Sequence, residues 1–459
     1  MSRKGLAKPR TGLAAPLNTK PKIGLAAVQK TKSKIGLAAV QKTRPKIGLA
    51  ALQNAKTKIG LAVAGGGPLG AIYEIGALCA LEEAIDGLEI TQLDGYVGVS
   101  AGAFVAAGLA NGMTPRQLCA SFIENIGPRD DIVYPTVFFR PAWGEFARRL
   151  AALPSLVAQA VAGVATGRRT LVSAAERLGR ALPTGLFSHA PLQAQLKRMF
   201  SLPGRSDDFR VLKRRLVLVA TDLDSGATAP FGQPGWDDVP ISTAVAASAA
   251  LPGLFPPVPV NGRWYVDGAL KKTLHARVLL DMNLDLVLCV NPLVPFDASH
   301  AHRHRLLAGA EDVIPRIVAG GLPVVLSQTF RSLIHSRLEL GMKGYEDSHP
   351  RTDIVLFEPD HRDPQLFTAN TFEYSQRRVL AEHAYQRTRA DLRSRRSVLG
   401  VTLARHGLVL NDAVLDDRKR TLLRRRAKAP QRRAAHSLHR LEEVLDDLDR
   451  ALAARSAAA

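Results

Sequence analysis

Apolar residues beyond position 58 fall into short continuous runs separated by longer segments rich in small residues. Continuous apolar runs of this length are typical of strands that are buried on both faces of a sheet. Six such runs are predicted to be strands, at residues 59–64, 96–99, 214–221, 263–266, 284–290 and 353–357.

Helix signals occupy the intervals between these runs. Pro68 suits the first turn of a helix over residues 68–84, and Gly70 and Gly76 would let that helix approach the sheet closely. A helix of small residues is predicted over 101–110. This order of strands and helices predicts an α/β fold, a three-layer α/β/α sandwich with a mostly parallel central sheet.

Composition divides the chain further. The main domain is predicted over residues 59–295, and within it 135–205 has few β-branched runs and many Ala, Arg and Pro, which indicates a helical insertion. Residues 296–400 are expected to complete the α/β body. Residues 401–459 are polar and basic and are predicted to form a helical extension, with an amphipathic helix over 438–453.

The first 58 residues form a repeat that is strongly basic. Fourteen Lys or Arg and no Asp or Glu lie there, two thirds of a formal net charge of +21. A 12-residue unit with so few apolar positions buries too little surface to fold alone. We expect a disordered, solvated tail, or one that attaches electrostatically to an anionic membrane or to nucleic acid. Gly-Leu-Ala recurs at Gly12, Gly24, Gly36, Gly48 and Gly60.

No signal peptide or convincing membrane span is found in the sequence. The best apolar candidate, residues 150–167, is rich in Ala and Gly and falls short of the ~20 strongly apolar residues that a span requires. Residues 146–182 are expected to form either a lid or membrane-lying helix, or an ordinary helical subdomain. We expect a cytoplasmic protein that associates peripherally with the inner face of a membrane.

The chemistry centres on a serine between two glycines. Gly98-Val-Ser100-Ala-Gly102 lies between a predicted strand and a predicted helix. Small flanking residues leave room for a sharp strand-to-helix turn that exposes a nucleophilic serine. Ser100 is therefore a candidate nucleophile, and a plain tight turn is the alternative.

The glycine run before it, Gly65-Gly66-Gly67 with Gly70, has two interpretations. It matches a dinucleotide fingerprint, but the acidic residues some 20 positions on, Asp86 and Glu89, fall at the end of a helix instead of a second strand. It also suits an oxyanion hole, in which consecutive N–H groups at a helix N-terminus stabilise developing negative charge. The nearby serine motif favours the oxyanion hole.

Two further motifs complete the set. Asp267-Gly268 follows a predicted strand, and Ser248 opens a run of Ala, Pro and Phe upstream. These four motifs stand in the order of the patatin-like phospholipase family, which the chain resembles over roughly residues 59–295. The resemblance implies a serine–aspartate dyad with Ser100 as nucleophile, Asp267 as general base and the amides of 65–67 as oxyanion hole. It implies no metal and no cofactor, and it assigns supporting roles to Gly70, Gly98, Gly102 and Gly268.

Two features bear on the chemistry that this resemblance implies. None of the twelve histidines lies within the glycine or serine motifs, although a triad that uses His275, His335 or His349 stays open. The family commonly carries a basic residue just before the last glycine of the oxyanion loop, where this chain has Leu69. A neutral lipid or another ester is therefore favoured over a phosphate-bearing substrate.

The sequence thus predicts a lipid acyl hydrolase that cleaves carboxylic esters, with a lipid or other ester as substrate. The first alternative is a non-catalytic lipid- or nucleic-acid-binding protein on an inactive patatin fold. A second, a nucleotide-binding oxidoreductase, is disfavoured because the acidic residue that would bind the ribose is missing.

Overall fold

The computed structural model describes residues 57–166, 170, 179, 181–300, 317–368 and 376–423. The chain divides into two units, Met1–Lys56 and Thr57–Ala459, and the described residues all belong to the second. The 12-residue repeat lies outside the described residues up to position 56, as does the amphipathic helix expected over 438–453.

One mixed sheet organises the described residues. Its strand order is β6-β7-β4-β3-β1-β8-β9, and β5 also pairs with β4. The five strands from β4 to β9 run parallel, whereas β5, β6 and β7 are antiparallel to their neighbours. The strands are β1 (Ile59–Val63), β3 (Gly95–Val99), β4 (Arg215–Asp222), β5 (Thr228–Phe231), β6 (Val258–Val260), β7 (Arg263–Asp267), β8 (Leu286–Val290) and β9 (Asp353–Phe357).

The predicted mostly parallel sheet is confirmed, and two strands are additional. β5 and β6 are short, and each contains a proline, Pro230 or Pro259, which argues against a strand in the sequence. Both lie in the antiparallel part of the sheet, away from the buried parallel strands. Proline has no N–H to donate to a neighbouring strand, and it is tolerated where that N–H would not be paired.

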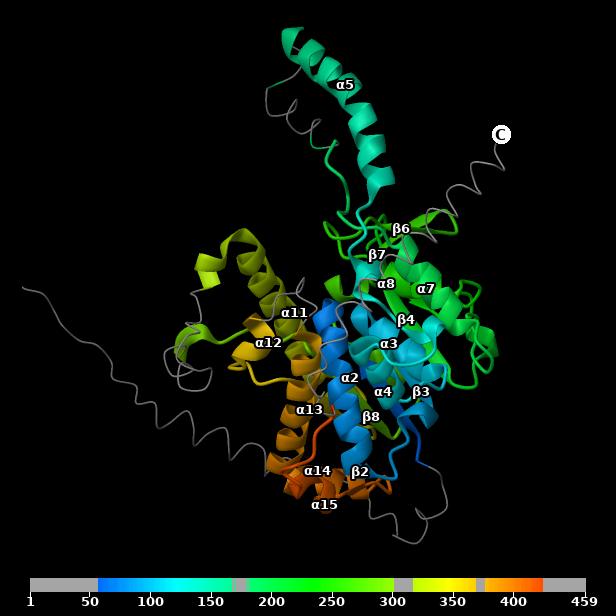
Figure 1. Ribbon diagram of the computed structural model, residues 1–459, viewed down its shortest axis with the longest axis vertical. Helices are drawn as coiled ribbons and strands as arrows, with labels where there is room; N and C mark the ends of the chain where they lie inside the picture. Colours follow the sequence, from blue (N-terminus) through cyan, green and yellow to red (C-terminus); the bar gives the residue numbers. More distant parts are fainter. Residues whose placement is uncertain are drawn as a thin grey trace, which may run out of the picture. The chain divides into compact units, whose positions relative to one another are not determined.

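Helices cover both faces of the sheet (Figure 1). Alternate residues along β1 and just after it enter two separate cores: Leu61 and Val63 join the larger one, and Ala62 and Ala64, which follows the strand, join the smaller one. This alternation follows from the two-residue period of a strand and produces the expected three layers. The larger core includes residues of α2 (Gly67–Ala84), α3 (Ala101–Ala110), α7 (Ala190–Phe200), α8 (Ile241–Ser248) and α13 (Arg377–Ser394). The smaller includes residues of α9 (Arg277–Leu280) and α11 (Gly321–Ser348).

The expectation that Gly76 would bring α2 close to the sheet is wrong. A Cβ at this glycine would lie 2.5 Å from the carbonyl oxygen of Ala381, so the close approach is to α13. Figure 1 shows α2 and α13 side by side. Helix α2 is buried along most of its length because it is packed by other elements on several sides. When a helix is apolar on all sides, its sequence does not indicate which neighbouring element a given glycine faces.

The described part of the predicted insertion, 135–205, is helical. It holds α5 (Trp143–Ala165) and α7, and it contributes no strand to the sheet among the residues that the structure describes. Several large apolar side chains of α5 are exposed, among them Leu150 at 69% and Val161 at 63%. Within the described ranges, no helix combines the length and the apolar character that crossing a membrane requires.

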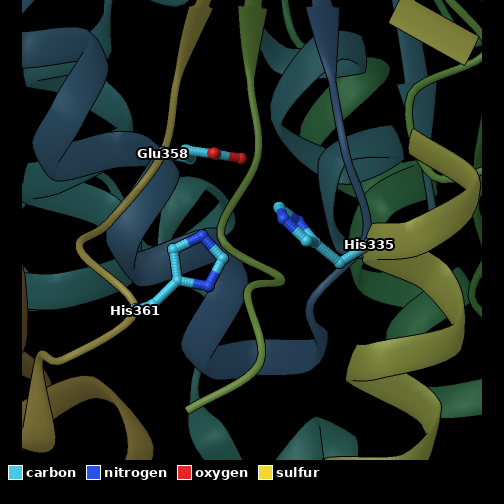
Figure 2. Close-up of side chains that lie close together, drawn as sticks. All are labelled: His335, Glu358 and His361. Atoms are coloured by element: carbon cyan, nitrogen blue, oxygen red, sulfur yellow. The ribbon is translucent and has the colours of Figure 1, made fainter. Parts of the chain in front are cut away.

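Two segments distant in sequence meet at the carboxyl ends of β8 and β9. His335 of α11 lies beside Glu358 and His361, which follow β9 directly (Figure 2). The ring centroids of the two histidines are 4.7 Å apart, edge to face. Since the parallel strands end at one edge, the side chains that follow them gather there.

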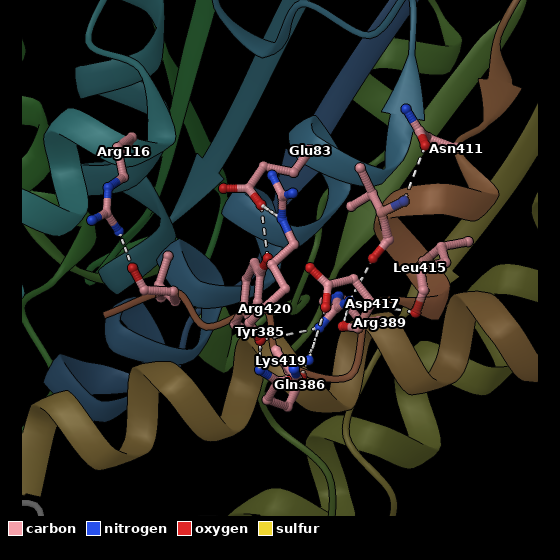
Figure 3. Close-up of polar contacts among 12 residues, drawn as sticks. Glu83, Arg116, Tyr385, Gln386, Arg389, Asn411, Leu415, Asp417, Lys419 and Arg420 are labelled. Carbon is pink, nitrogen blue, oxygen red and sulfur yellow. Dashed lines mark hydrogen bonds and ion pairs between the residues drawn. The ribbon is translucent and has the colours of Figure 1, made fainter. Parts of the chain in front are cut away.

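Residues 401–423, which the sequence placed in a C-terminal extension, pack onto the body. β10 (Val409–Leu410) pairs with β2 (Ile85–Asp86) at the end of α2. The buried guanidinium of Arg389 on α13 donates hydrogen bonds to the carbonyl oxygens of Val414 and, at 2.7 Å, Asp417 (Figure 3). A single arginine thus satisfies backbone acceptors of a segment with little regular structure.

Candidate active site

Ser100 sits in the turn between β3 and α3. Its backbone has φ 55° and ψ −121°, which is a rare conformation for a residue with a side chain. The flanking glycines permit the turn: a Cβ at Gly102 would lie 2.3 Å from the carbonyl oxygen of Ala64, and one at Gly98 would lie 2.6 Å from that of Gly102. The serine side chain is thereby lifted to the carboxyl edge of the sheet.

Asp267 reaches the same point from the end of β7. Its backbone N–H donates to the carbonyl oxygen of Ala250 at 3.0 Å, and its Oδ1 accepts a hydrogen bond from the N–H of Ala269 at 2.8 Å. Oδ2 accepts a hydrogen bond from Ser100 Oγ at 2.6 Å. At Gly268, a Cβ would lie 2.2 Å from the carbonyl oxygen of Val219, so only glycine allows β7 to turn here.

Burial dominates the ionisation of Asp267. The residue is 2% exposed, and desolvation raises its pKa from 3.8 to about 6, although the hydrogen bonds from Ser100 and the Ala269 amide act in the opposite direction. A pKa near 6 leaves the carboxylate ionised at neutral pH and makes it a stronger base than an ordinary aspartate.

The three histidines of the triad alternative lie elsewhere. Burial lowers the pKa of His275 to about 4, and its Nε2 faces the carbonyl oxygen of Gly268 at 3.4 Å. His349 Nε2 lies 3.5 Å from Asp281 Oδ1, and His335 belongs to the group beside β9. In the described part of the chain, none of them forms a hydrogen bond with Ser100 or Asp267. The serine and the aspartate are in direct contact, with no imidazole between them.

The triple glycine runs past the serine. A Cβ at Gly65 would lie 2.9 Å from Ser100 Cβ, and Gly67, at φ +61°, begins α2. Among the described residues, none accepts a hydrogen bond from the N–H groups of Gly65, Gly66 or Gly67. Free N–H groups at the start of an 18-residue helix, next to a serine hydroxyl, suit a developing oxyanion.

If these glycines bound a dinucleotide, an acidic residue near them would have to bind the ribose, and Asp86 is too far away to do so. Asp86 follows α2, whose 18 residues separate it from the glycine loop by about 27 Å at 1.5 Å per residue. Its Oδ1 accepts a hydrogen bond from Asn411 Nδ2 at 3.0 Å. It therefore lies at the wrong end of the helix to bind a ribose held at the glycines.

Ser248, to which the sequence analysis gave no separate role, holds the serine turn in place. It is the last residue of α8 and is fully buried. Its Oγ accepts a hydrogen bond from the Ser100 N–H at 2.8 Å and donates one to the carbonyl oxygen of Val219 at 2.6 Å. Its place in a family motif was the one available signal, since 148 residues separate it from Ser100.

Gly70 and Leu69 lie in the first turn of α2, and the only group of potential metal donors in the described residues lies outside the serine–aspartate pair. Gly70 donates its N–H to the carbonyl oxygen of Gly66 at 3.0 Å as α2 begins. Leu69 is buried in the larger core. In the described ranges, His335, Glu358 and His361 form the one group of three potential donors close enough to share a metal ion, and it contains neither Ser100 nor Asp267.

Comparison with known proteins matches this chain to a protein family and, among other solved structures, to two distant ones. The family model of patatin-like phospholipases matches residues 61–280. The crystal structure of VipD from Legionella pneumophila is 16% identical with a TM-score of 0.31, and the match covers 74% of this chain and 67% of that one. The heterodimeric ExoU–SpcU complex of the type III secretion system of Pseudomonas aeruginosa is 17% identical with a TM-score of 0.20, covering 76% and 62%. This chain thus spans about two thirds of the first and less of the second.

Proposed function

Residues 61–280 of this chain are a domain of the patatin-like phospholipase family, and from this premise we propose that it hydrolyses carboxylic esters of lipids through Ser100 and Asp267. One observation carries the proposal: Ser100 Oγ donates directly to Asp267 Oδ2 at 2.6 Å, and the pKa of that carboxyl is raised to about 6. A hydroxyl in contact with a base of this strength is an activated nucleophile.

In the first half-reaction, Ser100 Oγ attacks the ester carbonyl carbon while its proton moves to Asp267 Oδ2. The carbonyl oxygen becomes an oxyanion, and the N–H groups of Gly65, Gly66 and Gly67 stabilise it. The tetrahedral intermediate then breaks the bond to the alcohol. The alcohol leaves with the proton from Asp267, and the acyl group stays on Ser100.

In the second half-reaction, water replaces the alcohol. Asp267 takes a proton from the water, whose oxygen attacks the acyl carbon. The same N–H groups stabilise the second oxyanion, and its collapse releases the carboxylic acid. Ser100 recovers its proton from Asp267, so that the site returns to its starting state.

The oxyanion loop favours an uncharged head group. Leu69, at the position where the family commonly has a basic residue, is an apolar residue buried in the larger core. The loop thus contributes no cationic side chain at this position for a phosphate. We expect neutral acyl lipids or simple esters to be turned over faster than phospholipids, in a panel of lipids whose products are identified by mass spectrometry.

Access to lipid is proposed through α5 and the basic tail. Leu150, Val157 and Val161 are exposed and recur at spacings that place them on one face of α5. Deletion of residues 1–58 removes 14 positive charges and should weaken binding to anionic liposomes at low salt while soluble-ester turnover is retained. Loss of soluble-ester turnover in this deletion would count against a targeting role.

The test of the proposal is hydrolysis of a p-nitrophenyl ester. Ser100→Ala should reduce the rate to background, and Asp267→Ala should reduce kcat by about 10²- to 10⁴-fold. Asp224→Ala, at an exposed aspartate near the end of β4, is the matched control and should leave the rate unchanged.

Two outcomes would overturn the assignment. Equal activity in the wild type, Ser100→Ala and Asp267→Ala would remove the enzyme hypothesis and favour a non-catalytic lipid-binding protein. Near-complete loss of activity in His275→Ala, His335→Ala or His349→Ala, with the fold retained, would replace the dyad with a triad.

A further inference from the structure

The group formed by His335, Glu358 and His361 is organised as a set of donors around one point. Figure 2 shows the three side chains converging from α11 and from the segment after β9. One ligand-forming atom from each lies within 4.8 Å of the other two. Spacings of 23 and 3 residues form no compact metal-binding pattern, so this group could not be expected from the sequence.

Each of the three side chains is oriented from outside by one of its two polar atoms. His335 Nε2 lies 3.6 Å from Glu339 Oε1, and His361 Nδ1 lies 3.2 Å from the carbonyl oxygen of Pro295. Glu358 Oε2 accepts a hydrogen bond from Asn291 Nδ2 at 3.3 Å. The contacts of His361 and Glu358 are hydrogen bonds of the kind by which carbonyls and amides orient metal-binding side chains, whereas the contact of His335 with Glu339 is an ion-pair distance.

The opposite polar atom of each side chain is left for a ligand. His335 is 8% exposed, and its Nδ1 is buried and has no hydrogen-bond partner among the described residues. Glu358 Oε1 and His361 Nε2 likewise form no hydrogen bond within the described ranges. A buried ring nitrogen without a partner is costly unless something occupies the space it faces.

We propose that His335, Glu358 and His361 bind a divalent transition-metal ion of the zinc class. Two neutral imidazoles and one carboxylate are a common ligand set for Zn²⁺, and imidazole suits Zn²⁺, Ni²⁺ and Cu²⁺ far better than Mg²⁺ or Ca²⁺, which prefer oxygen ligands. Zn–N bonds of about 2.0–2.1 Å place tetrahedral ligand atoms roughly 3.3 Å apart. Binding therefore requires the ligand atoms, which lie within 4.8 Å of one another, to move closer together, and water completes the fourth position.

Such an ion would link two elements whose ligands are 23 or more residues apart in the sequence. His335 belongs to α11, whereas the other two ligands follow β9 at the edge of the sheet. Asn291, which holds Glu358, precedes Pro292, whose ring packs against the glycine loop: a Cβ at Gly66 would lie 2.8 Å from Pro292 Cγ. The metal is thus expected to stabilise α11 on the sheet and to stiffen the segment behind the loop.

Binding is tested on the full chain after treatment with a chelator and removal of that chelator. Titration with Zn²⁺ against a chromophoric competitor should give one ion per chain, and Co²⁺ should produce a visible absorption band of a bound, low-symmetry ion. His335→Gln and Glu358→Gln should each weaken Zn²⁺ binding by at least tenfold. His349→Gln, at a histidine just beyond α11 that lies outside the group, is the matched control and should bind as the wild type does.

The outcomes are decisive in both directions. The absence of 1:1 Zn²⁺ binding in the wild type, or undiminished binding in the folded His335→Gln variant, would overturn the proposal; if that variant fails to fold, His361→Gln gives the same test. Equal binding of Mg²⁺ and Zn²⁺ would also contradict it. The metal site does not depend on the proposed hydrolysis, because Ser100→Ala should bind Zn²⁺ as tightly as the wild type.

Discussion

Replacement of Asp267 by Asn should make the protein more stable at neutral pH while abolishing its proposed activity. Asn keeps the shape of the side chain. Its Oδ1 can accept the hydrogen bond from the Ala269 N–H, and its Nδ2 can donate to Ser100 Oγ, which reverses that bond without removing it. The variant loses only the buried negative charge and the base.

The magnitude follows from the pKa of Asp267. Its folded-state pKa of about 6 lies above the ordinary value of 3.8 because burial disfavours the charged form. The stability associated with the neutral carboxyl is therefore fully present below pH 3.8 and is lost as the pH rises through about 6. At 1.36 kcal/mol per pKa unit, the full difference is about 3 kcal/mol. Between pH 4 and pH 8, Asp267→Asn should gain about 2–3 kcal/mol relative to the wild type.

Urea unfolding at pH 4, 6 and 8 measures this gain. Asp222→Asn on the neighbouring β4 is the control with the opposite sign. Hydrogen bonds from the Ser225 N–H and from Arg263 lower the pKa of Asp222, so this carboxylate contributes stability that is present above the ordinary pKa. Its replacement should therefore destabilise the protein by nearly the same amount at pH 8 and at pH 4, because this stability is lost only as the pH falls below the ordinary pKa of 3.8. A stability difference for Asp267→Asn that does not change with pH, or that falls as the pH rises, would refute the argument from burial.

The same pKa sets the pH dependence of hydrolysis. The base form of Asp267 is populated above about pH 6, so kcat/KM of the wild type for a soluble ester should rise tenfold per pH unit below that value and reach a plateau above it. A profile that rises near pH 4 instead would mean that the carboxyl is not desolvated in the working enzyme.

Three further substitutions test the surroundings of the site and the fold. Ser248→Ala removes the acceptor of the Ser100 N–H and should lower kcat about tenfold with little change in KM, at a cost of about 1–3 kcal/mol in urea unfolding; unchanged kcat would exclude a positioning role. Gly65→Ala places a Cβ 2.9 Å from the Ser100 Cβ and should reduce ester turnover more than Gly67→Ala does. The Cβ of Gly67→Ala meets no atom within 4 Å, and this variant adds only about 1–2 kcal/mol of backbone strain at φ +61°. A larger loss of turnover in Gly67→Ala would contradict the packing argument. Arg389→Met removes the guanidinium donor from the carbonyl oxygens of Val414 and Asp417, of which the second keeps only the Arg420 N–H at 3.4 Å, and should destabilise the protein by about 3 kcal/mol. A loss below about 0.5 kcal/mol would show that the C-terminal segment is held by other contacts.

Local features of the sequence predicted the elements that carry the site. The parallel strands and α3 were identified within a few residues because their apolar runs and small residues are patterns of a single segment. The turn at Ser100 was identified in the same way, since Gly98 and Gly102 lie within two residues of it. A turn of this kind requires small residues on both sides of the serine, and the identity of adjacent residues can be read directly from the sequence.

The contacts between distant segments came from packing. Ser100 and Asp267 are 167 residues apart, and their direct hydrogen bond depends on the antiparallel pairing of β7 with β4. The same part of the sheet holds β5 and β6, two of the strands that the sequence did not predict. Resemblance to a family suggested that pairing, but no periodicity in the chain encodes it. The position of Gly76 against α13 likewise depends on a neighbour outside any local window.

The serine turn and the aspartate therefore differ in how they are specified. Backbone sterics place Ser100 at the end of β3 whatever the rest of the chain does, as long as the strand and helix form. The pKa of Asp267, the anchoring of the turn by Ser248 and the convergence of His335 with Glu358 arise only when layers far apart in sequence exclude water from one another. Desolvation is a property of the assembled core, and it has no counterpart in a linear pattern of residues.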